Sequence, residues 1–307
     1  MASLNPLRWS RRSKMVAAFG TLYVVWGSTY LAIKIGLNAG LPPAAFAGMR
    51  LVPAGLILLL LAKMRGIPLR IRRRDFVTCA VVGCFLLVGG MFTMFLAETS
   101  VPSGLAALLV AALPLWIALA ESALPGMERP SALGVVGLLI GLSGLGVLMY
   151  PRLAGMTGST AQLRGILVLL AGTWLWTTGS VLSKKRPIRA DAMVATGYEM
   201  LIAGLVLCGI ATVAGDWGRV QFSAGGAWAL AYLILFGSVM AFTAFVWALR
   251  NAPASKVMTY AYVNPVIAAF LGWAVLSERL DLWTLAGMVI IVAGVALTTS
   301  APTRPAR

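Results

Sequence analysis

The sequence contains no histidine and only three cysteines, Cys79, Cys84 and Cys208, each inside an apolar run. Without histidine, a Ser-His-Asp triad and histidine metal ligation are excluded, and the cysteines do not have the spacing of a metal site. The nine acidic residues form no close pair within an apolar run, and no G-x-x-x-x-G-K loop followed by Ser or Thr is present. We therefore expect no cofactor, no metal, no catalytic site and no direct coupling to ATP.

Charge is also scarce. Only 11% of the 307 residues are charged, whereas 60% are hydrophobic. Soluble domains average about 25% charged and about 45–50% apolar residues. A soluble fold of this size needs more polar surface to cover its core, whereas a lipid bilayer is an apolar solvent. The 33 glycines agree with this, because small residues let membrane helices approach closely. The composition therefore predicts an all-α integral membrane protein.

The net charge of +16 does not indicate a nucleic-acid partner. Nucleic-acid binders carry a basic face on a soluble module. Here the basic residues form short clusters between long apolar runs, which is typical of the cytoplasmic loops of membrane proteins. We expect a lipid bilayer around the chain and no nucleic acid.

The chain divides into ten apolar segments of about the length that crosses a bilayer. Short gaps containing proline or glycine separate them, so consecutive helices are expected to be antiparallel neighbours. The predicted spans are 15–36, 44–63, 75–97, 102–121, 130–150, 163–183, 191–213, 225–249, 254–276 and 281–300.

The loops on one side of the predicted membrane hold most of the lysines and arginines, such as Arg11, Arg12, Lys63 and Lys184. Basic loops stay in the cytoplasm. We therefore expect a multi-pass protein of the bacterial inner membrane, with both tails, 1–14 and 301–307, in the cytoplasm. An even number of spans agrees with this orientation.

An internal repeat with a period near 150 residues runs through the sequence. Trp26 matches Trp176, and Lys34 matches Lys184. Further pairs follow in the same order along the chain: Ala54-Gly55-Leu56 with Ala203-Gly204-Leu205, Pro102 with Pro253, Pro114 with Pro265, Glu128-Arg129 with Glu278-Arg279, and Gly137 and Gly144 with Gly287 and Gly294. The repeat predicts two five-helix units, 15–150 and 163–300. Because five is odd, the second unit enters the membrane from the opposite side.

Inverted repeats are typical of secondary transporters, which bind solutes near the midplane between the two halves. The residues of the repeat also resemble a known family. The stretch from Leu22 to Tyr30 and Arg50 are similar to the EamA-domain branch of the drug/metabolite transporter superfamily. So is the pattern Ala97, Pro102, Pro114 that recurs as Ala248, Pro253, Pro265, Glu278. The resemblance implies export or exchange of small organic molecules, including amino acids, metabolites and cationic drugs. One departure is Glu98, where many relatives carry a basic residue.

Aromatic and hydroxyl side chains near the midplane are the predicted solute-binding residues. At 3.6 residues per turn, Trp26, Thr29 and Tyr30 share one face of their helix, and the repeat-equivalent face carries Trp176 and Ser180. Aromatic walls suit aromatic or cationic ligands.

Five more candidates lie on three other spans. They are Phe92, Phe95, Leu113, Tyr260 and Asn264. Each aromatic candidate has an alternative interpretation as a lipid-facing or packing side chain.

Three ionisable residues lie within or beside the spans, where such groups are costly and often functional. The repeat aligns Arg50 with Glu199, but inversion places them at opposite depths. Each of the two residues has two interpretations. It either extends to the nearer membrane interface or forms a structural ion pair, or it acts in gating or proton coupling. Glu98 is either an interfacial residue or a carboxylate that attracts solute or binds a proton.

The sequence therefore predicts a secondary transporter that exports a small organic solute, with aromatic or hydrophobic amino acids as the best guess. Protons are possible coupling ions, and one chain holds both halves of a site. Two alternatives remain open at this point. A passive uniporter or channel agrees with the scarcity of carboxylates, and a polytopic lipid-modifying enzyme would need a polar cluster at an interface.

Overall fold

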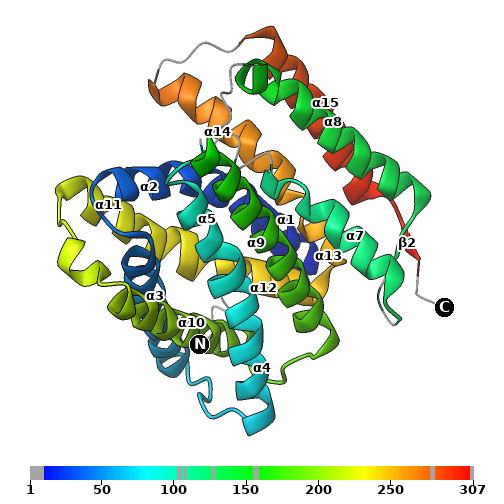
Figure 1. The fold of residues 1–307 in the computed structure, drawn as a ribbon. Helices are drawn as coiled ribbons and strands as arrows, with labels where there is room; N and C mark the ends of the chain where they lie inside the picture. Colours follow the sequence, from blue (N-terminus) through cyan, green and yellow to red (C-terminus); the bar gives the residue numbers. More distant parts are fainter. Residues whose placement is uncertain are drawn as a thin grey trace, which may run out of the picture.

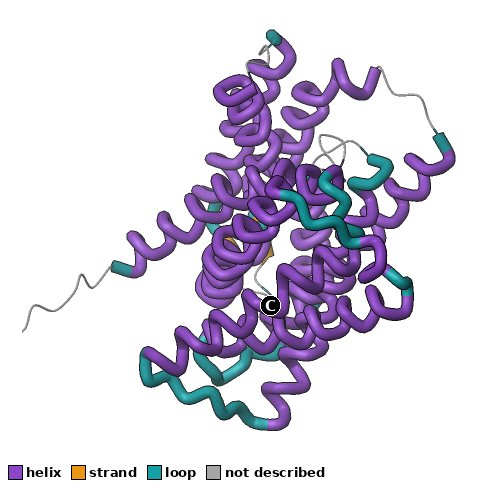
Figure 2. Tube along the Cα trace, turned by 90° about the vertical axis from the view of Figure 1, so that its left-hand side faces the viewer, coloured by secondary structure: helices purple, strands orange, loops and turns teal. Residues whose placement is uncertain are grey.

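The structure is a computed structural model that describes residues 10–101, 106, 109–125, 127, 129–154, 159–276 and 281–304. Several residues of the repeat pattern, including Pro102, Glu128, Glu278 and Arg279, lie outside these ranges. The chain is almost wholly helical, as Figure 2 shows. The only extended pairing in the described part joins β1 (Arg129–Pro130) to β2 (Thr303–Arg304).

Helices lie in each of the ten predicted spans, over the residues that the structure describes. In the first half they are α1 (Arg11–Thr21), η1 (Leu22–Trp26), α2 (Gly27–Asn38), α3 (Pro43–Met64), α4 (Arg73–Gly83), η2 (Cys84–Met91), α5 (Phe92–Ala97), α7 (Leu113–Ala123) and α8 (Ala132–Ala154). In the second half they are α9 (Thr160–Lys185), α10 (Ala192–Val213), η3 (Asp216–Arg219), α11 (Ala224–Tyr232), η4 (Leu233–Met240), α12 (Ala241–Asn251), α13 (Ala254–Val257), α14 (Tyr260–Leu276) and α15 (Leu282–Ser300).

Length and composition identify the membrane-crossing helices. Within the described ranges, seven continuous helices are long and apolar enough to cross a bilayer. The helices α7, α8 and α14 lie in the other three predicted spans. Large apolar side chains project outward from several helices, among them Leu60 on α3, Leu139 on α8, Leu205 on α10 and Val289 on α15. An outward apolar surface of this kind requires a lipid environment, so the chain is an all-α membrane protein.

The packing of α3 against α10 shows how the two halves are related. The Cβ position of Gly55 lies 2.7 Å from the backbone nitrogen of Leu201, and that of Gly204 lies 2.8 Å from the backbone nitrogen of Val52. Gly55 and Gly204 are equivalent in the repeat, and so are Val52 and Leu201. Each helix therefore presents the same surface to the other in antiparallel directions.

The helices α8 and α15 repeat this relationship at the other side of the bundle. The Cβ position of Gly137 lies 2.9 Å from the carbonyl oxygen of Gly294, and that of Gly287 lies 2.7 Å from the carbonyl oxygen of Gly144. Figure 1 shows this pair at the upper right and the α3–α10 pair at the lower left. Antiparallel pairing of equivalent helices places a pseudo-two-fold axis across the helix directions, so the two repeats are inverted.

The two ends of the bundle differ in charge. We call the end that carries Arg11, Lys63, Arg73, Lys184 and Arg250 the basic end. The opposite end is where α2 and α5 end and where α3, α9 and α11 begin.

Three helices contain π-helical turns near mid-depth: η1 in the first span, η2 in the third and η4 in the eighth. A π-helical turn adds a residue to the helical turn and shifts the face that follows, and such turns are frequent at functional sites. Since η2 and η4 occupy equivalent positions in the repeats, the two halves share this irregularity.

Candidate functional site

A cavity of about 80 Å³, measured as space for the centres of water molecules, lies between the two repeats. The first half lines it from η1, α2, α3, η2 and α5 and with Val110 and Leu113, and the second half lines it from α9, α12 and α14. Most lining residues of the first, second, third and sixth spans lie between mid-depth and the opposite end. The cavity therefore occupies the half of the bundle away from the basic end.

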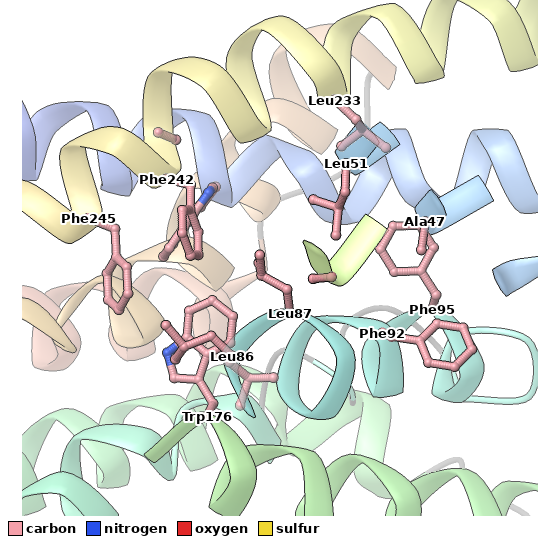
Figure 3. Close-up of a cluster of buried hydrophobic side chains, with 14 of the residues drawn as sticks. Ala47, Leu51, Leu86, Leu87, Phe92, Phe95, Trp176, Leu233, Phe242 and Phe245 are labelled. Atoms are coloured by element: carbon pink, nitrogen blue, oxygen red, sulfur yellow. The ribbon is translucent and has the colours of Figure 1, made fainter. Parts of the chain in front are cut away.

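Aromatic rings close the cavity toward the basic end. The Trp26 ring meets the rings of Trp176, Tyr260 and Phe245 at centroid distances of 5.8, 4.7 and 5.2 Å. Phe242 packs beside them and lines the cavity, whereas Phe245 is fully buried beneath it. Figure 3 shows Trp176, Phe242 and Phe245 converging from α9 and α12. The contacts of Trp26 with Trp176 and Tyr260 are edge to face, and such contacts favour a fixed arrangement of rings over a loose apolar wall.

Two polar groups of the first half are held by η4. The Trp26 Nε1–H donates to the carbonyl oxygen of Gly237 at 3.1 Å, and the Arg50 Nε–H donates to the Ser238 hydroxyl at 2.8 Å. Arg50 also lies over the Phe95 ring, with Cζ 5.9 Å from the centroid. The π-helical turn thus positions an indole and a guanidinium at the cavity wall.

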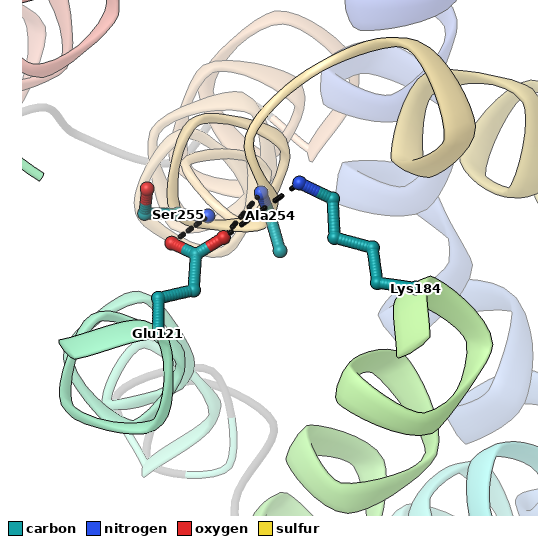
Figure 4. A network of polar contacts seen from close by, with 4 residues as sticks. All are labelled: Glu121, Lys184, Ala254 and Ser255. Atoms are coloured by element: carbon teal, nitrogen blue, oxygen red, sulfur yellow. Dashed lines mark hydrogen bonds and ion pairs between the residues drawn. The ribbon is translucent and has the colours of Figure 1, made fainter. Parts of the chain in front are cut away.

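A polar network lies nearer the basic end, between α7, α9 and α13. Glu121 is fully buried, and its carboxylate accepts hydrogen bonds from the backbone N–H groups of Ala254 at 2.9 Å and Ser255 at 3.2 Å. The Lys184 Nζ lies 3.8 Å from the same carboxylate (Figure 4). The network joins the first half, through α7, to two elements of the second half. It therefore links the two halves between the aromatic rings and the basic end.

The structure brings most of the predicted residues to one cavity. Eight of them line it: Trp26, Thr29, Tyr30, Arg50, Leu113, Trp176, Tyr260 and Asn264. They come from five spans, and they include the repeat-related pair Trp26 and Trp176.

Phe92 and Phe95 do not line the cavity. Both are buried, and the Phe95 ring packs on the Phe46 ring at a centroid distance of 5.3 Å. Met91 and Met94 face the cavity instead. The physical reason is η2, because its π-helical turns rotate the following residues away from the face that regular helical spacing gives.

Ser180 does not line the cavity either. It is fully buried, and its hydroxyl donates to the carbonyl oxygen of Trp176 at 2.8 Å. Ser180 is repeat-equivalent to Tyr30, but inversion puts equivalent residues at opposite depths. The cavity therefore meets α9 on the N-terminal side of Trp176, at Leu169 and Thr173. The inverted repeat, applied to depth as well as to faces, could have predicted these two residues.

Glu98 and Glu199 lie outside the cavity. Glu98 is fully buried at the end of α5, and neither of its carboxylate oxygens has a hydrogen-bond partner among the described residues. Its backbone carbonyl accepts a hydrogen bond from the Lys34 Nζ at 2.9 Å. Glu199 is buried on α10, where its backbone approaches the Cβ position of Gly83. Arg50 bonds to Ser238 rather than to Glu199.

Two further residues that line the cavity could not be recognised from their residue type in the sequence. Gly90 and Gly172 belong to the close contact of the third and sixth spans, where Cβ atoms would meet Trp176 and Thr93.

Comparisons with known proteins agree with this architecture. A sequence model of the EamA-like transporter family matches the chain twice, over residues 14–150 and 163–300. An uncharacterized inner membrane transporter of Escherichia coli strain K12, YedA, is 35% identical over 294 residues, which cover 95% of this chain and 93% of that protein. YoaV of Bacillus subtilis strain 168, an uncharacterized transporter, is 23% identical over 93% of this chain and 97% of its own length.

A solved crystal structure of a protein has the same fold. It superposes with a TM-score of 0.79 at 23% sequence identity, over 94% of this chain and 97% of that one. At this identity the match supports the fold alone.

Proposed function

Because the chain belongs to the EamA-like transporter family, we propose that this multi-pass membrane protein is a secondary transporter that exports small organic solutes. Aromatic and hydrophobic amino acids are the proposed solutes. The proposed mechanism is alternating access, in which the two inverted repeats exchange conformations around a central site.

One observation carries this proposal. The cavity lies between the repeats, beside the contact of Trp26 with Trp176, and aromatic rings and the Glu121 network close the bundle on one side of it. A site that is closed toward one end and lies in the other half of the bundle suits one of the two states that alternating access requires. The exchange of conformations between equivalent helices supplies the other state.

The loop charges support the proposed orientation. Basic residues gather at the end that holds the start of α1, so this end is proposed to be cytoplasmic, with the C-terminal segment at the same end through the pairing of β1 with β2. The proposed location is the bacterial inner membrane. Both halves of the cavity come from one chain, which supports transport by a monomer.

Transport by purified protein tests the proposal. Proteoliposomes loaded with unlabelled L-phenylalanine or L-leucine are expected to take up the labelled amino acid by counterflow. A matched preparation of the double variant Trp26→Ala, Trp176→Ala is expected to lose at least about ten-fold in rate, because the aromatic part of the site is removed. If no small organic solute exchanges in a screen of amino acids and organic cations, the exporter proposal fails.

A passive uniporter is the second candidate, and one observation favours it. No carboxylate lines the cavity in the part of the chain that the structure describes, so the lining offers no acidic side chain for proton coupling. A passive uniporter would show counterflow but no accumulation driven by a pH gradient, and a channel would show neither. Counterflow together with accumulation driven by a pH gradient would decide for proton-coupled transport.

A further inference from the structure

Arg50 is a buried cation that has no acidic partner among the described residues. Its exposed fraction is 5%, and its recorded contacts are the hydrogen bond to Ser238 and the face of the Phe95 ring. Both contacts are with neutral groups. The ion pairs among the described residues, Lys184 with Glu121 and Arg219 with Asp216, do not involve Arg50.

An isolated buried charge is costly, because its lost hydration is repaid only by an opposite charge and by further hydrogen bonds. Arginine does not escape this cost by losing its proton, since it stays charged in proteins. The only hydrogen bond of the Arg50 side chain to the described residues uses Nε. The two Nη groups of a guanidinium form the fork that binds a carboxylate. The cavity wall thus carries a guanidinium whose carboxylate partner is absent from the described residues.

Two other buried polar atoms on cavity-lining residues make no hydrogen bond of standard geometry in the described structure, although the Tyr30 hydroxyl lies near Asn264 and the Tyr260 hydroxyl lies near Trp176. They are Asn264 Oδ1, which can accept a hydrogen bond, and Trp176 Nε1, whose hydrogen can be donated. Buried polar atoms are normally hydrogen-bonded, so each exception requires an explanation. Both belong to the same cavity as Arg50, and one bound solute can satisfy all three.

The size of the cavity limits that solute. One water molecule needs roughly 10–15 Å³ of the space open to water centres. The cavity, at about 80 Å³, therefore holds roughly five to eight waters. This corresponds to one solute of amino-acid size and is too small for a peptide or a nucleotide.

We propose that Arg50 is the carboxylate-binding residue of this cavity. The solute places its carboxylate on the Arg50 guanidinium and its amino group near Asn264 Oδ1 and the indole faces of Trp26 and Trp176. Its apolar side chain lies among the aromatic rings. The site then selects amino acids and related carboxylates and rejects organic cations that have no carboxylate. This inference rests on the proposed function, because it names the chemistry of the same site.

Matched probes that differ in one group test the inference. L-Phenylalanine carries both charged groups, phenethylamine has no carboxylate, and hydrocinnamate has no amino group. Ligand binding raises the midpoint of thermal unfolding of the purified protein in detergent, and this measurement does not require transport. We expect L-phenylalanine and hydrocinnamate to bind at least about ten-fold more tightly than phenethylamine, since hydrogen bonds to charged groups are the strong ones. The same comparison uses L-leucine, isoamylamine and isocaproate as a smaller set.

Two variants and a control locate the effect. Arg50→Met keeps the length of an apolar side chain and removes the buried charge, so it is expected to fold at least as stably as the parent and to bind all three probes within about three-fold of one another. Arg50→Lys keeps the charge without the fork and is expected to retain part of the preference. Arg164→Gln removes an exposed cation from α9 near the opposite end and is expected to leave the preference unchanged.

The outcomes separate this inference from the proposed function. Phenethylamine binding as tightly as hydrocinnamate, a preference that survives in Arg50→Met, or no binding by either probe set would overturn the assignment of Arg50. If amino acids exchange in proteoliposomes without a carboxylate preference, the inference fails and the transporter proposal stands. If the carboxylate preference is found but no solute is transported, the site stands and the transporter proposal fails.

Discussion

Trp26 and Trp176, which are equivalent in the two repeats, meet edge to face with ring centroids 5.8 Å apart. The inverted repeat brings together two residues that are 150 positions apart in the chain. Their environments nevertheless differ. The Trp26 Nε1–H donates to Gly237, whereas Trp176 Nε1 makes no hydrogen bond of standard geometry and only lies near the Tyr260 hydroxyl.

This difference predicts unequal effects of the same substitution. Trp26→Phe removes a buried hydrogen bond to the Gly237 carbonyl, whereas Trp176→Phe removes no hydrogen bond of standard geometry. Both substitutions replace an indole by a smaller phenyl ring, so their losses of packing are similar. Trp26→Phe is therefore expected to lower the free energy of unfolding by about 1 kcal/mol more than Trp176→Phe. Trp176→Phe is expected to weaken L-phenylalanine binding without that extra loss. Thermal unfolding of both variants, with and without ligand, measures the two effects, and equal losses of stability would contradict the assignment.

Glu121 is expected to hold the basic end closed. Glu121→Ala frees two backbone N–H groups of α13, whereas Lys184→Met removes only a pair with an N···O distance of 3.8 Å. Partly exposed ion pairs contribute about 1 kcal/mol or less, and buried unpaired N–H groups cost more. Glu121→Ala should therefore open the cavity toward the basic end, and Lys184→Met should do so only weakly.

Cysteine labelling measures this opening. A single cysteine is placed at Thr173, which lines the cavity, in a chain without Cys79, Cys84 and Cys208. A membrane-impermeant thiol reagent applied from the basic end should label it slowly in the parent and several-fold faster with Glu121→Ala. Equal rates in the two proteins would exclude a closing role for Glu121.

Glu98 is a candidate for the residue that binds a coupling proton. Its carboxylate is fully buried with no hydrogen-bond donor among the described residues, although the Lys34 ammonium and the Tyr30 hydroxyl lie near it. An ionised carboxylate without a donor is costly to bury, so the neutral form is favoured unless Lys34 turns toward it. Glu98→Gln imitates the neutral form. Counterflow of L-phenylalanine is expected to persist in this variant, while accumulation driven by a pH gradient is lost. A variant that still responds to the gradient would remove Glu98 from the coupling mechanism.

The ten spans and the inverted repeat could be predicted from the sequence because both depend on patterns that repeat over many residues. The length of an apolar run identifies a span, and an odd number of spans in each repeat means that the second repeat is inverted. Seven of the predicted solute-binding residues line the cavity, and most of them are aromatic or polar side chains near mid-depth, such as Trp26 and Asn264; Arg50, predicted for gating or coupling, lines it as well. Phe92 and Phe95 lie outside the lining of this cavity, and the sequence could not show this because the π-helical turns of η2 have no simple residue signature. The charge on Arg50 was visible, but its missing partner depends on three-dimensional contacts.

Close helix packing through glycine predicts the last effect, which compares two neighbouring glycines of α8. The Cβ position of Gly144 lies 2.7 Å from the backbone nitrogen of Ile291 on α15, whereas that of Gly146 has nothing within 4 Å. Backbone cannot move aside as a flexible side chain can, so Gly144→Ala forces α8 and α15 apart and is expected to destabilise the protein by about 1–3 kcal/mol. Gly146→Ala meets no neighbouring atom and only reduces the conformational entropy of the unfolded chain. It is expected to be neutral or to stabilise the protein by up to about 1 kcal/mol. Thermal unfolding of the two variants in the same detergent measures the difference. If both are tolerated alike, the tight pairing of α8 with α15, and with it the symmetric contact of the two repeats at this side of the bundle, would be contradicted.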